Sequence, residues 1–194
     1  MGRSSTVVLR ADKNQSQIMK TKAATPKESI EFADLRDLFI AQLKDLYSAE
    51  KQIVKDGLPK MIKTASDPDL VEGLSAHLEE TKWQIKRLEQ ISDALGEKLT
   101  GETCEATKGL LKEAAGWMEE DATDEVMDAG IIADGQRLEH YEISAYGTAH
   151  AYAILLGEKE TAKLLAETLE EEKAANDKLG HAAKSINQSA LAVS

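Results

Sequence analysis

Apolar residues recur at three- and four-residue steps along most of the chain after residue 28, which is the period of an amphipathic helix. The pattern predicts four long helices, at residues 29–57, 68–95, 124–156 and 158–183. A shorter amphipathic segment at 103–120 lies between the second and third, and it has to carry the chain back along their length. The expected fold is therefore all-α: an antiparallel four-helix bundle with a short extra helix in the long crossover between helices 2 and 3.

Glycine and proline mark where these helices are expected to break. The first helix should kink or end at residues 57–59, Gly-Leu-Pro, with another turn or two over 60–65. Gly96 and Gly157 stand where the second and third helices should stop. Residues 187–194 are expected to fray.

A weak internal repeat supports this layout. Residues 77–82 (HLEETK) match residues 168–173 (TLEEEK), an offset of 91 from His77 to Thr168, and the first and third helices align best at an offset of 92. Two related αα-hairpins joined by a crossover would produce this pattern.

Acidic side chains fall within or beside the apolar stripe of every long helix. A carboxylate that faces a core is costly unless a metal ion or an opposite charge compensates it. Both hairpins separate their carboxylates by 30 residues, from 50 to 80 and from 142 to 172, which puts them at comparable heights in the bundle. Carboxylate oxygens suit iron or manganese and can bridge two ions. The sequence predicts a site for two such ions per chain, with the candidate ligands Glu50, Glu80, Glu139, Glu142 and Glu172.

Several choices stay open at this level. A single near-core glutamate is usually a boundary residue that reaches solvent or a lysine, and the repetition on four helices favours a shared site instead. The repeat pairs Glu80 with Glu171, whereas the apolar stripe favours Glu172 as the inward residue. His77, one turn before Glu80, could be a ligand or a hydrogen-bond partner, and we favour the partner role.

The other polar residues near the stripe have expected roles of their own. Tyr47 and Tyr146 should pack in the core, with hydroxyls free to orient carboxylates. His140 lies off the stripe and should be exposed, while His150 could support the site or lie at an interface. Gln84 continues the row of His77 and Glu80, without a clear role.

Composition narrows the classes of function. The net charge of −11 argues against binding to nucleic acid or to an anionic membrane. The single cysteine, Cys104, cannot form an internal disulfide, so a reducing cytoplasm is the expected location. Residues 1–28 carry six bases and two acids, and they predict a basic arm that is disordered or packs on an acidic partner subunit. Residues 29–194 form the expected bundle domain.

In combination, several segments resemble the YciE/YciF family of stress-associated ferritin-like proteins. The segments that carry the resemblance are 35–39, 43–51, 58–61, 77–81, 136–147 and 164–179. The resemblance implies a ferritin-like bundle, a di-iron site and a homodimer, with no established reaction.

The chain departs from the wider di-iron pattern, in which the second and fourth helices carry Glu-x-x-His. Trp83 and Ala175 stand where those histidines would be, so the expected site is all-oxygen. Glu139-x-x-Glu142 does resemble the doubled carboxylate on the third helix of rubrerythrin.

Three functions compete on this basis. The first is a protein that binds iron or manganese and consumes peroxide during stress, with Glu139 as a mobile extra ligand. The second is a metal-free helical protein that acts through dimerisation or a partner. The third, a storage shell, ranks last because nothing in the sequence predicts a cage. No substrate, electron donor or organic ligand is evident.

Overall fold

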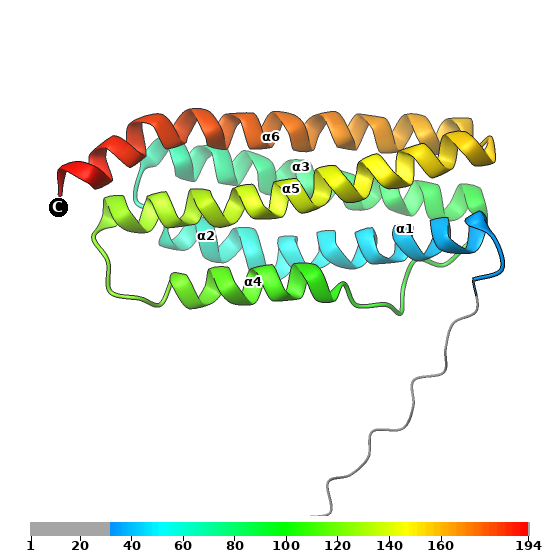
Figure 1. Cartoon of the computed structure of the whole chain (residues 1–194), viewed down its shortest axis with the longest axis horizontal. Coiled ribbons are helices and arrows are strands. Elements are labelled where there is room, and N and C mark those ends of the chain that lie inside the picture. Colours follow the sequence, from blue (N-terminus) through cyan, green and yellow to red (C-terminus); the bar gives the residue numbers. More distant parts are fainter. Residues whose placement is uncertain (1–31, 194) are drawn as a thin grey trace, which may run out of the picture. The chain divides into compact units, whose positions relative to one another are not determined.

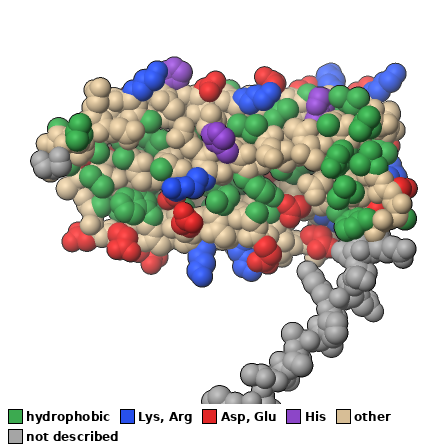
Figure 2. Space-filling model, in the orientation of Figure 1, with side chains coloured by type: hydrophobic (Ala, Val, Ile, Leu, Met, Phe, Trp, Pro, Cys, Tyr) green, Lys and Arg blue, Asp and Glu red, His purple; other side chains and the backbone are tan. Residues whose placement is uncertain are grey.

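A computed structural model describes residues 32–193 of the chain, drawn as a cartoon in Figure 1 and as a space-filling model in the same orientation in Figure 2. Within that range every regular element is a helix, and the all-α prediction is confirmed. The elements are α1 Leu35–Gln52, the π-helical turn η1 Ile53–Gly57, α2 Leu58–Thr64, α3 Pro68–Leu95, α4 Glu105–Trp117, α5 Asp124–Leu156 and α6 Lys159–Ala192. The predicted basic arm, residues 1–28, lies outside the described residues.

Four rods form the bundle, and Figure 1 shows them side by side: α1 continued by η1 and α2, then α3, α5 and α6. α1 packs on α3 and α5, and α6 packs on the same two helices. The chain reverses direction between each of these contacting pairs (Figure 1), so all four contacts are antiparallel. α4 runs back along the outside and contacts α5, α1 and η1, as predicted for the crossover.

The break in the first rod is a π-helical turn rather than an end. Pro59 cannot donate a backbone hydrogen bond and would clash with the carbonyl of the preceding turn, and the wider turn Ile53–Gly57 absorbs this before α2 begins. α4 approaches closely at the same level, because a Cβ on Gly57 would lie 2.8 Å from Cδ2 of Leu111. The glycine thus allows the crossover helix to pack on the kink.

The predicted helix boundaries were wrong at the two outer ends. α1 begins only at Leu35, where the side chain of Asp34 caps it by accepting a hydrogen bond of 3.0 Å from the backbone N–H of Asp37. α6 continues to Ala192 instead of fraying from residue 187. The reason is Ile186, which is buried and packs in the core, so tertiary contact extends a helix beyond its obvious apolar pattern.

The apolar core consists of two clusters, one toward each end of the bundle. One contains Phe39, Leu43, Leu46, Leu88, Ile91, Tyr146 and Leu165. The other contains Ile53, Met61, Leu70, Leu74, Ile131, Leu138 and Ile186. Each long helix passes from one cluster to the other through a short buried polar stretch, so a polar layer crosses the middle of the core.

Candidate metal centre

The polar layer contains four fully buried or nearly fully buried glutamates from three helices. Glu50 comes from α1, Glu139 and Glu142 from α5, and Glu172 from α6, and none is more than 3% exposed. Glu139 and Glu142 are one turn apart and share a face of α5. Four of the five predicted ligands therefore meet in the core.

These carboxylates form two groups whose potential ligand atoms lie within 4.8 Å of one another. One group is His77, Glu139 and Glu172, and the other is Glu50, Glu142 and Glu172. Glu172 belongs to both groups. This arrangement suits two neighbouring cations that share one carboxylate, because a carboxylate can present one oxygen to each ion.

One residue contacts a carboxylate in each group: Tyr146 contacts Glu50, and His77 contacts Glu139. The hydroxyl of Tyr146 donates a hydrogen bond to Oε1 of Glu50. Nε2 of His77 lies 3.2 Å from Oε1 of Glu139 and 4.0 Å from Oε2 of Glu172. The predicted role of Tyr146 in orienting a carboxylate is thus confirmed.

Many oxygens in this layer have no hydrogen-bond partner among residues 32–193. They are Oε2 of Glu50, Oε2 of Glu139, Oε1 of Glu142 and both oxygens of Glu172. Buried polar atoms are normally paired, so a cluster of unpaired acceptors points to a missing donor or cation. A donor set of carboxylate oxygens with one imidazole is suited to iron or manganese, and the residues therefore fit the predicted ions.

Electrostatics oppose a fully ionised cluster in the absence of a cation. Burial raises the pKa of Glu50 to about 7, against the lowering effects of the Tyr146 hydrogen bond and the charge of His77. Burial, followed by the charge of Glu50, raises the pKa of Glu142 and of Glu172 well above the usual range. Without metal, protons must neutralise part of this layer.

His77 is affected in the same direction through its neighbours. Burial alone would lower the pKa of this imidazole, but the carboxylates of Glu139, Glu80 and Glu172 raise it well above its ordinary value. In the absence of metal, a proton on His77 compensates the charge at the Glu139 end of the layer.

The fifth predicted ligand, Glu80, lies at the margin of the layer and outside both groups. Its side chain is 39% exposed, with Oε2 3.6 Å from Nδ1 of His77 and Oε1 3.6 Å from Nζ of Lys178. Glu171, at the matching position of the repeat, is likewise marginal and pairs with Arg87. The structure decides the sequence ambiguity in favour of Glu172, which is fully buried.

His77 contacts Glu80 and Glu139, as the favoured partner role predicted. Its imidazole lies among the candidate ligands, which makes it a candidate ligand as well as a hydrogen-bond partner. The available signal was its spacing on α3, since Leu70, Leu74, His77 and Thr81 continue one buried stripe. The expected all-oxygen site therefore gains one nitrogen. His140 is exposed as predicted.

The remaining residues of interest occupy distinct places. His150 is half-buried and belongs to neither group. Gln84 is fully buried, and its Nε2 donates a 3.2 Å hydrogen bond to Glu171. The Tyr47 hydroxyl donates to Glu89 rather than to the buried carboxylates.

Another buried contact was missed altogether. The thiol of Cys104 caps α4 and lies 3.0 Å from the hydroxyl of Tyr141, which donates to Asp45. These residues are far apart in sequence and lie on three different segments, so no local spacing could indicate the contact.

Comparisons with known proteins agree with the fold and the site-bearing helices. The family model described as "Domain of unknown function (DUF892)" matches residues 34–192. Protein YciF of Escherichia coli (strain K12) is 44% identical over 146 residues, which are 75% of this chain and 87% of that protein.

Solved structures show the same architecture. The crystal structure of the E. coli stress protein YciF has a TM-score of 0.78 at 42% identity, covering 81% of this chain and 99% of that chain. YcfI from Rhodopseudomonas palustris has a TM-score of 0.76 at 47% identity, covering 78% and 96%.

Over residues 32–193, the helices lack the combination of length and hydropathy that a membrane span requires. The family model covers nearly all of the described chain, and the resemblance read from the sequence is confirmed by YciF at 44% identity. The chain therefore belongs to the family described as "Domain of unknown function (DUF892)", and protein YciF of E. coli is among its relatives.

Proposed function

We propose that the polar layer binds two iron or manganese ions and that the iron-loaded protein reduces peroxide. The observation that carries this proposal is the pair of three-residue groups that share Glu172. The unpaired buried oxygens of the same residues support it, because cations would satisfy them. The name of the E. coli relative, a stress protein, agrees with such a role.

Each residue has a distinct task in this proposal. Glu50, Glu142 and Glu172 would hold one ion, and His77 and Glu139 would hold the other together with the shared Glu172. Tyr146 holds Glu50 in place through its hydrogen bond. Two ferrous ions in these positions would supply one electron each to a peroxide O–O bond.

The chain's own residues would handle protons and water around that chemistry. Metal binding displaces protons from Glu142 and Glu172, because their pKa values are raised mainly by burial. Without metal, Glu139 pairs instead with His77, whose Nε2 is 3.2 Å away. The apolar clusters on both sides exclude bulk water from the layer.

Anaerobic reconstitution with ferrous iron, followed by elemental analysis, tests the proposal. We expect close to two ions per chain in the wild type and a loss of both in a Glu50→Ala, Glu142→Ala double variant. One equivalent of hydrogen peroxide should then oxidise the two ferrous ions in each chain. Absence of bound metal after reconstitution, together with an unchanged melting temperature, would overturn it.

A further inference from the structure

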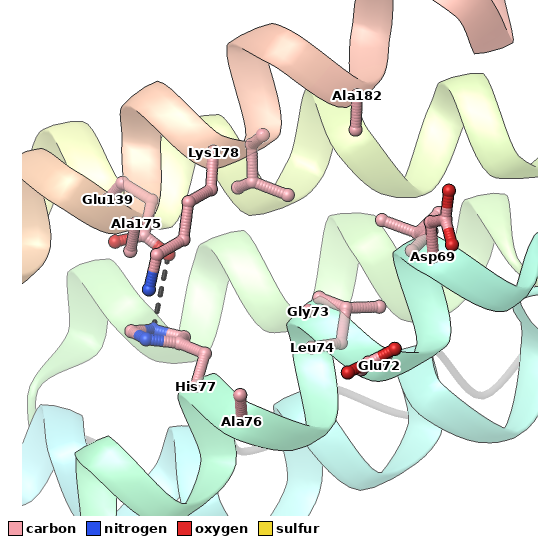
Figure 3. Close-up of a pocket in the computed structure, with 12 residues that line it drawn as sticks. Asp69, Glu72, Gly73, Leu74, Ala76, His77, Glu139, Ala175, Lys178 and Ala182 are labelled. Carbon is pink, nitrogen blue, oxygen red and sulfur yellow. Dashed lines mark ion pairs between the residues drawn. The ribbon is translucent and has the colours of Figure 1, made fainter.

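A pocket of about 480 Å³ leads from the surface to the His77–Glu139 end of the polar layer. It lies between α3 and α6, with Glu139 of α5 at its inner end (Figure 3). The volume falls within the range of about 300–1,000 Å³ that is usual for small-molecule sites. Its walls are mostly apolar and include Leu70, Leu74, Leu179 and Ala182.

The inner end of the pocket presents polar atoms that are buried and unpaired. His77 is 8% exposed and Glu139 is 3% exposed, and both line the pocket. Oε2 of Glu139 has no hydrogen-bond partner within the described part of the chain, and Nδ1 of His77 makes no hydrogen bond there, although Oε2 of Glu80 lies 3.6 Å from it. A ligand with one small polar end could satisfy these atoms while its apolar remainder stays against the leucines.

Charges around the pocket restrict the ligand further. Figure 3 shows Asp69 and Glu72 at the end away from His77, and the amino group of Lys178 near the His77–Glu139 pair. If a fatty acid bound with its carboxylate at the end of the pocket away from His77, that carboxylate would be repelled by Asp69 and Glu72. The charges therefore disfavour such a ligand. A neutral organic molecule meets no such repulsion.

We propose that this pocket selects neutral organic hydroperoxides, with the alkyl or aryl group on the apolar walls and the hydroperoxide group at His77 and Glu139. This inference rests on the proposed function and names the substrate class of the same site. The pocket ends at the group that contains His77, so the ligand would approach the site from that side.

The reaction balances as a two-electron reduction. The O–O bond breaks, the organic oxygen takes one proton and leaves as an alcohol, and the distal oxygen keeps its own hydrogen, takes a second proton and leaves as water. Two ferrous ions lose one electron each, and a further turnover needs an external one-electron donor. Solvent that enters through the pocket mouth supplies the two protons.

Gly73 provides a way to close the pocket without altering any candidate ligand. It lines the pocket on α3, and a Cβ built there meets nothing within 4 Å, so Gly73→Leu should fill space rather than clash. The matched control is Gly109→Leu on α4, where a Cβ also meets nothing within 4 Å and the pocket is not involved. Both variants replace a helical glycine with a better helix former.

The binding test uses cumyl alcohol, the unreactive product analogue of cumene hydroperoxide, with the metal-free full-length protein. Calorimetry should show one molecule bound per chain in the wild type and in Gly109→Leu, and binding at least tenfold weaker in Gly73→Leu. Absence of binding to the wild type, or equal binding by all three proteins, would overturn the inference.

Kinetics with the iron-loaded protein separate this inference from the proposed function. For Gly73→Leu, the second-order rate constant for oxidation of the two ferrous ions in a single turnover should fall at least tenfold with cumene hydroperoxide and stay within twofold with hydrogen peroxide. Equal losses for the two substrates would count against selection by the pocket. If the protein reduces hydrogen peroxide but does not bind cumyl alcohol, this inference is wrong and the proposed function stands. Cumyl alcohol binding by a protein that takes up no metal would sink the proposed function, and with it the assignment of hydroperoxide as substrate.

Discussion

The two sides of the polar layer occupy matching positions of the repeat but differ in access. We call Arg87, Glu171 and Thr168 the closed side, and His77, Glu80 and Lys178 the open side. At the 91-residue offset Glu80 corresponds to Glu171, Arg87 to Lys178 and His77 to Thr168. Each side thus pairs a partly exposed glutamate with a cation. The pocket between α3 and α6 is lined by His77 and Lys178 of the open side.

The closed side is sealed by a two-pronged ion pair. Nη1 and Nη2 of Arg87 contact the two oxygens of Glu171 at 2.8 and 2.9 Å, and Nη1 also donates to Thr168 at 2.6 Å. On the open side Nζ of Lys178 is 3.6 Å from Glu80, and the lysine side chain is 62% exposed. A planar guanidinium can fix a carboxylate in this way and an ammonium cannot.

The comparison shows that the two copies of one repeated hairpin can differ: one copy closes its side with an ion pair, and the other lines a pocket. Thr168 on the closed side is a small residue that completes the arginine contacts, whereas His77 on the open side turns toward the carboxylates. The repeat also breaks in the core, because Thr81 stands at the position that corresponds to Glu172. Only one half therefore supplies the carboxylate that both groups share.

The largest effect is expected for iron binding, when Glu172 and its neighbour Glu171 on α6 are replaced in turn. Glu172→Gln should remove most of the bound iron, because it weakens both groups at once, and changes at such ligands or their supports typically cost about 10–100-fold in affinity or more. Glu171→Gln should retain wild-type iron, since that side chain pairs with Arg87. Elemental analysis after anaerobic reconstitution measures both, and equal retention by the two variants would contradict the assignment.

The next effect concerns pH and the metal-free protein. The pKa of Glu50 is raised in the folded state from 4.5 to about 7, and the pKa values of Glu142 and Glu172 are also raised well above the usual range, chiefly by burial. The folded state therefore binds more protons than the unfolded state above pH 4.5, and stability falls as pH rises through about 7. His77, whose pKa is also raised, acts in the same direction.

We expect the free energy of unfolding of the metal-free protein to drop by a few kcal/mol between pH 5 and pH 8. Bound metal should flatten this dependence, because the carboxylates are then ionised and compensated. Urea unfolding at several pH values, with and without manganese, measures the difference. Metal-free stability that rises over this interval would refute the raised pKa values.

A smaller effect is expected when the closed side is opened. Arg87→Met should destabilise the protein by about 1–3 kcal/mol, since it leaves the partly buried Glu171 without its charged partner. Arg87→Lys should recover only part of this loss, because one ammonium cannot contact both carboxylate oxygens. Urea unfolding of the three proteins provides the comparison, and full recovery by lysine would show that two-pronged geometry is unimportant.

The smallest effect belongs to the corresponding cation on the open side. Lys178→Met should change stability by less than about 1 kcal/mol, as is usual for an exposed ion pair. The same urea assay applies. A loss as large as that of Arg87→Met would mean that the two sides are equally sealed.

The sequence predicted most of the bundle because its information is local and periodic. Three- and four-residue spacing identified the long helices. The short amphipathic segment 103–120, between the second and third of them, indicated a crossover along the bundle. The extension of α6 to Ala192 could not be predicted in this way, since it depends on contacts that Ile186 makes with other helices. The cap that delays α1 was readable in principle at Asp34.

The candidate site shows the same division. Spacing placed Glu50, Glu139, Glu142 and Glu172 in core registers, and the apolar stripe correctly preferred Glu172 over Glu171. The equal 30-residue separations predicted that Glu80 lies level with the other carboxylates. Its side chain is 39% exposed, because height along a helix does not specify which way a side chain faces. The face of α3 that points into the bundle carries His77, and Glu80 lies beside that face at the margin of the polar layer.

By itself, the sequence determined the helices, their order and the presence of acidic residues at one level, because each follows from the periodicity of a single segment. Tertiary structure decided that His77 joins the carboxylates, that Glu172 is shared by two groups, and that one side is sealed by Arg87 while the other adjoins a pocket. These features depend on the relative rotation of packed helices, which arises only when side chains from different segments fill a common interior.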